Sequence, residues 1–243
     1  MASRMLRPVI DMAMTVLLLL SMAYELVGPP FARLLEGTLG LSVDEYELGP
    51  VMHEWLGITL IALFFWHLWL NRYWLKNLFK GRYNATRAVL SAVNILLILD
   101  VAFLLASGLM MARSLPVIDV PGGMAFARTA HILASYWGYV IMSFHIGLYW
   151  HVMNAMMFRR SSSASPSPLR RALPHAAALV LMAFGLRALM KRQIGEYLFL
   201  VSEFVFFDFE EPIFYFFLDY IAVMILFACL GHYLILLFRR LKI

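Results

Sequence analysis

Charged side chains are scarce in this sequence: Asp, Glu, Lys and Arg make up 14% of the 243 residues, against 63% hydrophobic residues. A soluble domain of this length could not bury so much apolar surface, so the composition predicts an integral membrane protein. A single cysteine, Cys229, excludes an internal disulfide. Glycine-rich phosphate loops and the Ser/His/Asp signatures of hydrolases are missing as well. The sequence therefore does not indicate an enzyme that handles soluble metabolites on its own.

Histidine is also rare, with seven in the chain, yet four of them repeat one spacing. His53 and His67 are fourteen residues apart, and so are His131 and His145. On a helix this interval is a rise of about 21 Å and just under four turns, so both rings of a pair leave the same face. Two such helices side by side would oppose His53 to His131 at one depth and His67 to His145 at another. A lone histidine in an apolar helix is more often a packed residue than a ligand, but the doubled interval favours ligands.

Opposed imidazoles on facing helices are how a helical bundle holds a haem by its two axial positions. The spacing therefore predicts two haem groups, with the four paired histidines as axial iron ligands. Because the chain has no Cys-x-x-Cys-His attachment motif, the haems would be bound non-covalently, as haem b. We expect room for the porphyrins beside Gly57 and Gly138, although small residues also serve plain helix packing.

The apolar runs predict an all-α membrane protein with six transmembrane helices. They cover 9–27, 51–74, 88–111, 124–158, 173–189 and a last span from 212 to 238. Gly28, Pro29 and Pro30 are expected to end the first helix, and residues 31–49 to form a polar, acidic connection. The expected organisation is a four-helix haem-binding bundle over 1–160, a flexible linker over 161–168 and a two-helix extension over 169–243.

Basic residues gather in alternate connections. The N-terminus, residues 72–87, residues 159–171 and the C-terminus hold fourteen of the twenty Lys and Arg and no acid. By the positive-inside rule these segments are cytoplasmic, and we expect the chain in a bacterial inner membrane. The second and fourth spans then run in the same direction, with the first histidine of each pair near the outer surface. The charge distribution thus agrees independently with the pairing of the histidines.

Several other residues have two interpretations. Arg128 could pair with the propionates of the outer haem and Arg72 with those of the inner haem, or both could be interfacial residues. Asp100, in the middle of a span, could handle protons beside a quinone or a haem, or make a structural hydrogen bond, for example with Asn94. A third metal or haem site built from the remaining histidines is the less favoured interpretation: His151, His175 and His232.

Acidic residues recur every seven positions between 194 and 211, at Glu196, Glu203 and Glu210. On a helix they would share one face, which predicts an interfacial helix on the outer side with its acids toward water. The face is either merely solvated or a docking surface that steers a basic electron-transfer partner toward the outer haem.

The chain resembles known cytochromes in a few stretches scattered over most of its length: 53–57 (HEWLG), 67–71 (HLWLN), 206–212 (FFDFEEP) and 231–234 (GHYL). The two His-x13-His helices are similar to the ligand helices of the cytochrome b core of quinol:cytochrome c oxidoreductases. The closer resemblance is to small bacterial membrane cytochromes of the flavinylation-associated group, long classed as a domain of unknown function. It implies haem ligation by the four paired histidines and electron exchange with a quinone pool or extracytoplasmic redox partners.

The sequence therefore predicts transmembrane electron transfer through two b-type haems, between the quinone pool and an extracytoplasmic protein or a larger membrane redox complex. It indicates no nucleic-acid partner. One alternative is a stand-alone membrane oxidoreductase that uses the outer haem on a small species such as superoxide or ferric iron. A second alternative is a haem-free membrane transporter or metal-binding protein.

Overall fold

The computed structural model describes residues 2–42, 44–113, 123–157 and 167–241, and all regular structure within them is helical. In chain order the helices are α1 (Ala2–Met22), α2 (Tyr24–Leu39), α3 (Glu45–Leu70), α4 (Arg72–Asn77), α5 (Ala85–Met111), α6 (Gly123–Met157), α7 (Pro168–Lys191), α8 (Ile194–Leu198) and α9 (Ile213–Leu241). The expected all-α class is confirmed for the described part of the chain.

Four of the described helices, α3, α5, α7 and α9, are long and apolar enough to cross a membrane. The pair α1 and α2 meets the same criterion together, but with a bend of 92° between its two parts. Helix α6 is long enough at 35 residues, but it is not among the helices that meet this criterion. The described residues therefore hold four candidate membrane-spanning helices, or five if the bent pair is one span, as expected of a membrane protein.

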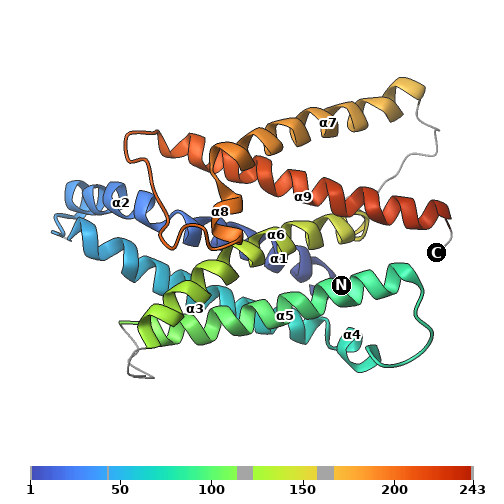
Figure 1. Ribbon diagram of the computed structural model, residues 1–243, viewed down its shortest axis with the longest axis horizontal. Helices are drawn as coiled ribbons and strands as arrows, with labels where there is room; N and C mark the ends of the chain where they lie inside the picture. The colour runs from blue at the N-terminus through green and yellow to red at the C-terminus, as the bar shows by residue number, and fades with distance from the viewer. Residues whose placement is uncertain (1, 43, 114–122, 158–166, 242–243) are drawn as a thin grey trace.

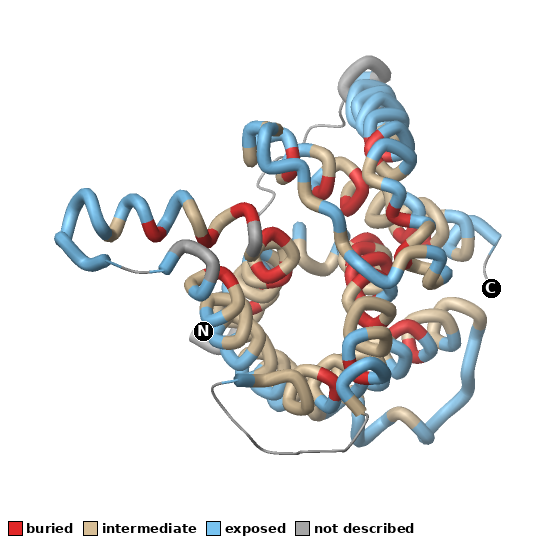
Figure 2. The backbone as a smooth tube through the Cα atoms, turned by 60° about the vertical axis from the view of Figure 1, so that its left-hand side comes forward, coloured by how far each residue is buried: buried red, intermediate tan, exposed pale blue. Residues whose placement is uncertain are grey.

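The long helices lie side by side, and α2 turns away from them (Figure 1). Helix α6 is central: it packs against α5 on one side and α9 on the other, and it also contacts α1. Helix α7 packs mainly on α9, and α3 packs mainly on α1 and α2. Seen more nearly end-on, the backbones of several helices form a ring (Figure 2).

Glycines allow α6, α7 and α9 to pack closely. A Cβ atom at Gly147 would collide with the carbonyl of Ala228, and one at Gly231 would collide with that of Phe144. Gly185 of α7 meets the backbone of α9 in the same way. Backbones that approach this closely gain van der Waals contact where no hydrophobic effect is available inside a bilayer. These three helices therefore form the tightly packed side of the molecule.

The predicted end of the first helix is wrong. Helix α1 ends at Met22, and α2 continues through Pro29 and Pro30 to Leu39. The break at Ala23 lies six residues before Pro29, and both prolines lie inside α2. Much of the expected polar connection over 31–49 is therefore helical.

The other boundaries agree more closely with the sequence. The second predicted span corresponds to α3 followed by the short α4, with the break at Asn71, whose side chain donates to the carbonyl of His67. Helices α5, α6, α7 and α9 each cover their predicted spans to within a few residues. Most of the predicted flexible linker, residues 161–166, lies outside the described residues, as do Arg159 and Arg160, and Pro168 already begins α7.

The predicted acidic interfacial helix is also wrong. Helix α8 ends at Leu198, and residues 199–212 contain no regular helix. Leu200 adopts the left-handed conformation with φ of 53°, which stops the helix. Further on, the Asp208 carboxylate accepts hydrogen bonds from the backbone N–H groups of Glu210 and Glu211, a local turn that competes with helix formation. The three glutamates at seven-residue intervals therefore do not share a helix face.

Candidate functional site

A cavity of about 1720 Å³ lies mainly between α1, α3, α5 and α6 and extends to residues 203–209. Pockets that bind one small molecule are typically about 300–1,000 Å³, so this volume suits two groups of that size. The four side chains that the sequence predicts as ligands all line it: His53, His67, His131 and His145.

His53 and His131 are opposed across the cavity. The ring centres of His53 and His131 are 5.8 Å apart, with 74° between the ring planes. Two imidazoles bound to one metal through nitrogens about 2 Å from it have their ring centres about 6 Å apart. At the other level, His145 lies within electrostatic range of His67 and of Asp11. The structure thus brings together the pair His53 and His131, and both members of the other predicted pair, His67 and His145, line the same cavity.

In two of these histidines, hydrogen bonds determine which ring nitrogen carries the proton. Nδ1 of His53 lies 2.9 Å from the carbonyl oxygen of Ser21. Nδ1 of His67 lies 2.7 Å from a carboxylate oxygen of Asp11. Because a carbonyl or carboxylate oxygen only accepts hydrogen bonds, Nδ1 is the protonated nitrogen in both rings. Nε2 is then the nitrogen with the lone pair.

In His131, a hydrogen bond to a hydroxyl group sets the same tautomer. Its Nδ1 lies 3.0 Å from Oγ of Ser107, and that hydroxyl donates its proton to the carbonyl of Phe103 at 2.7 Å. The hydroxyl therefore accepts from Nδ1–H, and Nε2 again carries the lone pair. This tautomer, with Nδ1–H held by the protein, is typical of histidines that bind a metal through Nε2. Nδ1 of His145, by contrast, is buried without a hydrogen-bond partner in the described structure.

Glycines on three helices border the cavity, as a flat ligand would require. A Cβ atom at Gly57 of α3 would meet no atom within 4 Å. At Gly108 of α5 it would lie 3.5 Å from Cε1 of His131. The space beside Gly138 of α6 is taken by the carboxylate of Asp100. The expected room is thus present at Gly57, whereas at Gly138 it is shared with an acidic side chain.

Asp100 lines the cavity beside Gly138, which lies midway along α6 between its two histidines. The structural partner suggested by the sequence is engaged elsewhere, because the side-chain amide of Asn94 donates to the hydroxyl of Tyr149 at 3.1 Å. The carboxyl group therefore lies between the two histidine levels, where it faces the cavity.

Three arginines line the cavity, and Arg72 is not among its described lining residues. The guanidinium of Arg72 instead stacks 4.8 Å from the ring centre of Trp69. At the same end, Arg7 lines the cavity, and its Nε is buried with no hydrogen-bond partner in the described structure. Three residues before His131, Arg128 lines the cavity 5.8 Å from the ring centre of Phe204. Arg113 is the third cationic lining residue.

Asp11, Ser107 and Arg7 were not singled out by the sequence. Asp11 could have been, because it is an ionisable residue within the first apolar run, and such residues are functional by default. Ser107 carries no comparable signal, since its role depends on α5 and α6 lying side by side.

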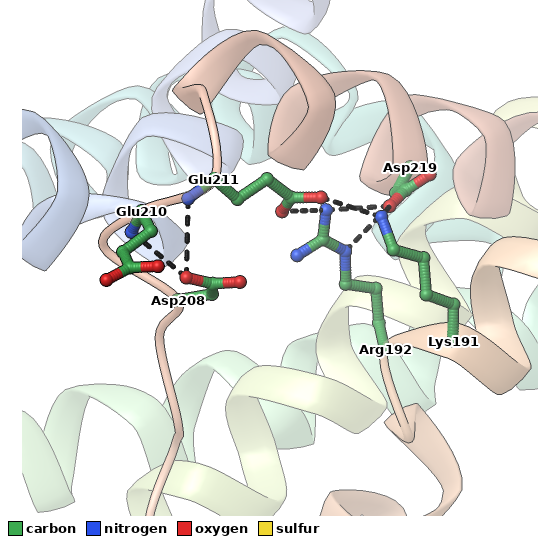
Figure 3. A network of polar contacts seen from close by, with 6 residues as sticks. All are labelled: Lys191, Arg192, Asp208, Glu210, Glu211 and Asp219. Atoms are coloured by element: carbon green, nitrogen blue, oxygen red, sulfur yellow. Dashed lines mark hydrogen bonds and ion pairs between the residues drawn. The ribbon is translucent and has the colours of Figure 1, made fainter.

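An ion-pair network joins the end of α7 to the start of α9 (Figure 3). Nζ of Lys191 lies 2.7 Å from Glu211 and 2.8 Å from Asp219. Arg192 binds the same two carboxylates at 2.5 and 2.7 Å. Burial alone would raise the pKa of Glu211, but its hydrogen bonds to the two cations lower that pKa below the ordinary value. The network fixes the segment that returns the chain from α8 to α9.

The other three histidines lie on the ends of α6, α7 and α9 and are not among the lining residues described for the cavity. The described residues contain no group of three or more His, Cys, Asp or Glu side chains placed to hold a metal ion. A third metal site built from these histidines therefore has no support in the described structure.

No family model, curated protein or solved structure matches the chain, so the candidate site is interpreted from its own geometry.

Proposed function

We propose that the chain is a membrane cytochrome b that binds two haem b groups, one between His53 and His131 and one between His67 and His145. The observation that carries this proposal is the hydrogen bonding of the ring nitrogens. Three of the four imidazoles have Nδ1–H held by a carbonyl, a carboxylate or a hydroxyl group, which orients the ring and leaves Nε2 as the basic nitrogen.

The number of ligands favours haem over a bare metal ion. Each level offers two imidazoles, and the described residues hold no larger cluster of ligating side chains. A bare Zn²⁺ site usually has at least three protein ligands. A porphyrin supplies four nitrogens in its own plane and needs only two axial ligands, one from each side. The cavity volume and the open space at Gly57 suit such flat groups.

We infer six spans, formed by α1, α3, α5, α6, α7 and α9. Helix α6 is included because a helix packed against α1, α5 and α9 does not need an apolar surface on every side. The start of α1, helix α4 and the end of α9 lie toward one end of the bundle (Figure 1). The basic segments make this the cytoplasmic end in a bacterial inner membrane.

The two haem levels would then be stacked across the bilayer, about 21 Å apart along the helix axes. Bound haem would supply the one-electron chemistry. The protein would hold each group by two rings of fixed tautomer and balance its propionates with Arg7 at the inner level and Arg113 or Arg128 at the outer level. We propose that electrons pass between the quinone pool and an extracytoplasmic redox partner, with Asp100 placed to exchange a proton.

Reconstituted vesicles test this function. Ferricyanide trapped inside should be reduced by external dithionite only when the wild-type protein is in the membrane. A variant with His53→Ala and His67→Ala should behave like protein-free vesicles. A control with Glu36→Gln, which changes an exposed residue of α2 outside the cavity, should keep the wild-type rate. Equal rates in the wild type and the first variant would refute the proposal.

A further inference from the structure

Outside the cavity, a group of basic side chains lies on α6, α7 and α9, toward the end of the molecule at which α9 ends. On α6, Nε2 of His151 lies 2.7 Å from Nη2 of Arg239 on α9. Since a guanidinium can only donate hydrogen bonds, His151 is the acceptor and is neutral in this contact. The positive charge at this point is therefore the charge of Arg239.

The group continues across α9 to α7. Nδ1 of His175 lies 2.9 Å from the hydroxyl of Tyr233. The ring centre of Tyr233 is 5.8 Å from that of His175 and 5.5 Å from that of His232. His232 is in turn within electrostatic range of both His175 and Arg239. We call these five residues, which lie on three helices, the basic band: His151, His175, His232, Tyr233 and Arg239.

The basic band has no acidic counter-charge on its own helices. Residues 129–157, 167–192 and 220–241 contain neither Asp nor Glu. The nearest acid along α9 is Asp219, which is thirteen residues before His232 and is held in the ion-pair network at the other end of the helix. The charge of Arg239 therefore calls for an anion from outside these helices.

The surroundings of the basic band are apolar. Leu173 and Leu179 of α7 are 65% and 66% exposed, and Leu237 of α9 is 49% exposed. Helices α7 and α9 diverge toward this end (Figure 1). Each of these exposed leucines is within four residues of His175 or Arg239 along the chain. A phospholipid joins an anionic phosphate to apolar acyl chains. It therefore matches a cationic side chain that lies beside exposed leucines at the ends of apolar helices.

We propose that the basic band binds the phosphate of an anionic phospholipid, whose acyl chains lie along the exposed faces of α7 and α9. Arg239 donates charge-assisted hydrogen bonds to the phosphate, and the histidine and tyrosine side chains add neutral donors. The site is distinct from the cavity and does not depend on the proposed haems. It would seat the two C-terminal helices in the leaflet that contains anionic lipid.

Native mass spectrometry of delipidated protein in detergent tests the site. Phosphatidylglycerol should bind more tightly than phosphatidylcholine, and Arg239→Gln should reduce that preference about fivefold, the effect expected for one cation at a membrane surface. Arg239→Lys keeps the charge and should retain most of the preference. Arg82→Gln, which removes an exposed cation at the same end of the molecule, is the control and should leave it intact.

Three outcomes would overturn the proposal. The first is equal binding of the two lipids by the wild type. The second is an equal loss of preference in the Arg239→Gln and Arg82→Gln variants, which would indicate diffuse surface charge. The third is full displacement of the lipid by millimolar inorganic phosphate, which would indicate a site for the free anion.

Discussion

Asp11 provides the sharpest prediction about the proposed pair of His67 and His145. Its carboxylate accepts the hydrogen bond from Nδ1 of His67 at 2.7 Å, and the side chains of both residues are only 25% exposed. Asp11→Asn keeps the size of the side chain and an accepting oxygen but removes the charge. Asp11→Ala removes the acceptor as well and leaves the His67 ring free to rotate.

The magnitude follows from the role of the contact. Loss of a group that orients a metal-binding histidine lowers metal affinity about 10–100-fold. That range corresponds to about 1.4–2.7 kcal/mol of binding free energy. We expect Asp11→Asn to lie at the lower end, because the hydrogen bond persists, and Asp11→Ala at the upper end. The outer pair uses Ser21 and Ser107 instead of Asp11, so its haem should be retained.

Haem titration of the purified variants, followed by visible absorbance, measures this effect. One of two binding steps should weaken in the Asp11 variants, and Ser107→Ala should weaken the other step. Glu36→Gln, which neutralises an exposed acid on α2, is the matched control and should change neither. The reasoning is refuted if Asp11→Ala binds haem like the wild type, or if both steps weaken equally.

Three further predictions concern other parts of the chain. Asp100→Asn should slow haem reduction by quinol several-fold in stopped-flow measurements at unchanged haem content, and unchanged kinetics would leave Asp100 a structural role. Glu211→Gln should lower the free energy of unfolding by about 1.5–3 kcal/mol at pH 7, because it removes charge-assisted hydrogen bonds. Since the folded-state pKa of Glu211 is lowered, the wild type should lose this advantage as the pH falls below about 4, and a difference that persists in acid would contradict the assignment. Reporter fusions after Lys80 should report the cytoplasm and fusions within 36–48 the opposite side, and reversed signals would invert the electron path.

The approach of His53 to His131 could be predicted from the sequence because it rests on periodicity and charge. A fourteen-residue interval fixes a helix face, and the positive-inside rule fixes the relative direction of two helices. The interval is a local property of the sequence, and the charge rule is a sum over its segments. The structure accordingly brings His53 close to His131 and places all four rings on one cavity.

The hydrogen-bond partners of the histidines could not be predicted in the same way. Whether Ser107 reaches His131 depends on how α5 and α6 pack, and sequence spacing does not encode that rotation. Whether Arg7 or Arg72 lines the cavity depends on the break at Asn71, after which Arg72 belongs to a separate short helix. The seven-residue period of the glutamates was misleading because a single left-handed residue, Leu200, ends α8 early.

The haem content of the purified protein tests the central proposal most directly. A pyridine haemochrome assay against protein concentration should give two haem b per chain. His53→Ala and His67→Ala should each reduce this number to about one, and the double variant should hold none. A colourless wild-type protein, or full haem retention in the double variant, would contradict the proposal that the two histidine pairs are haem ligands.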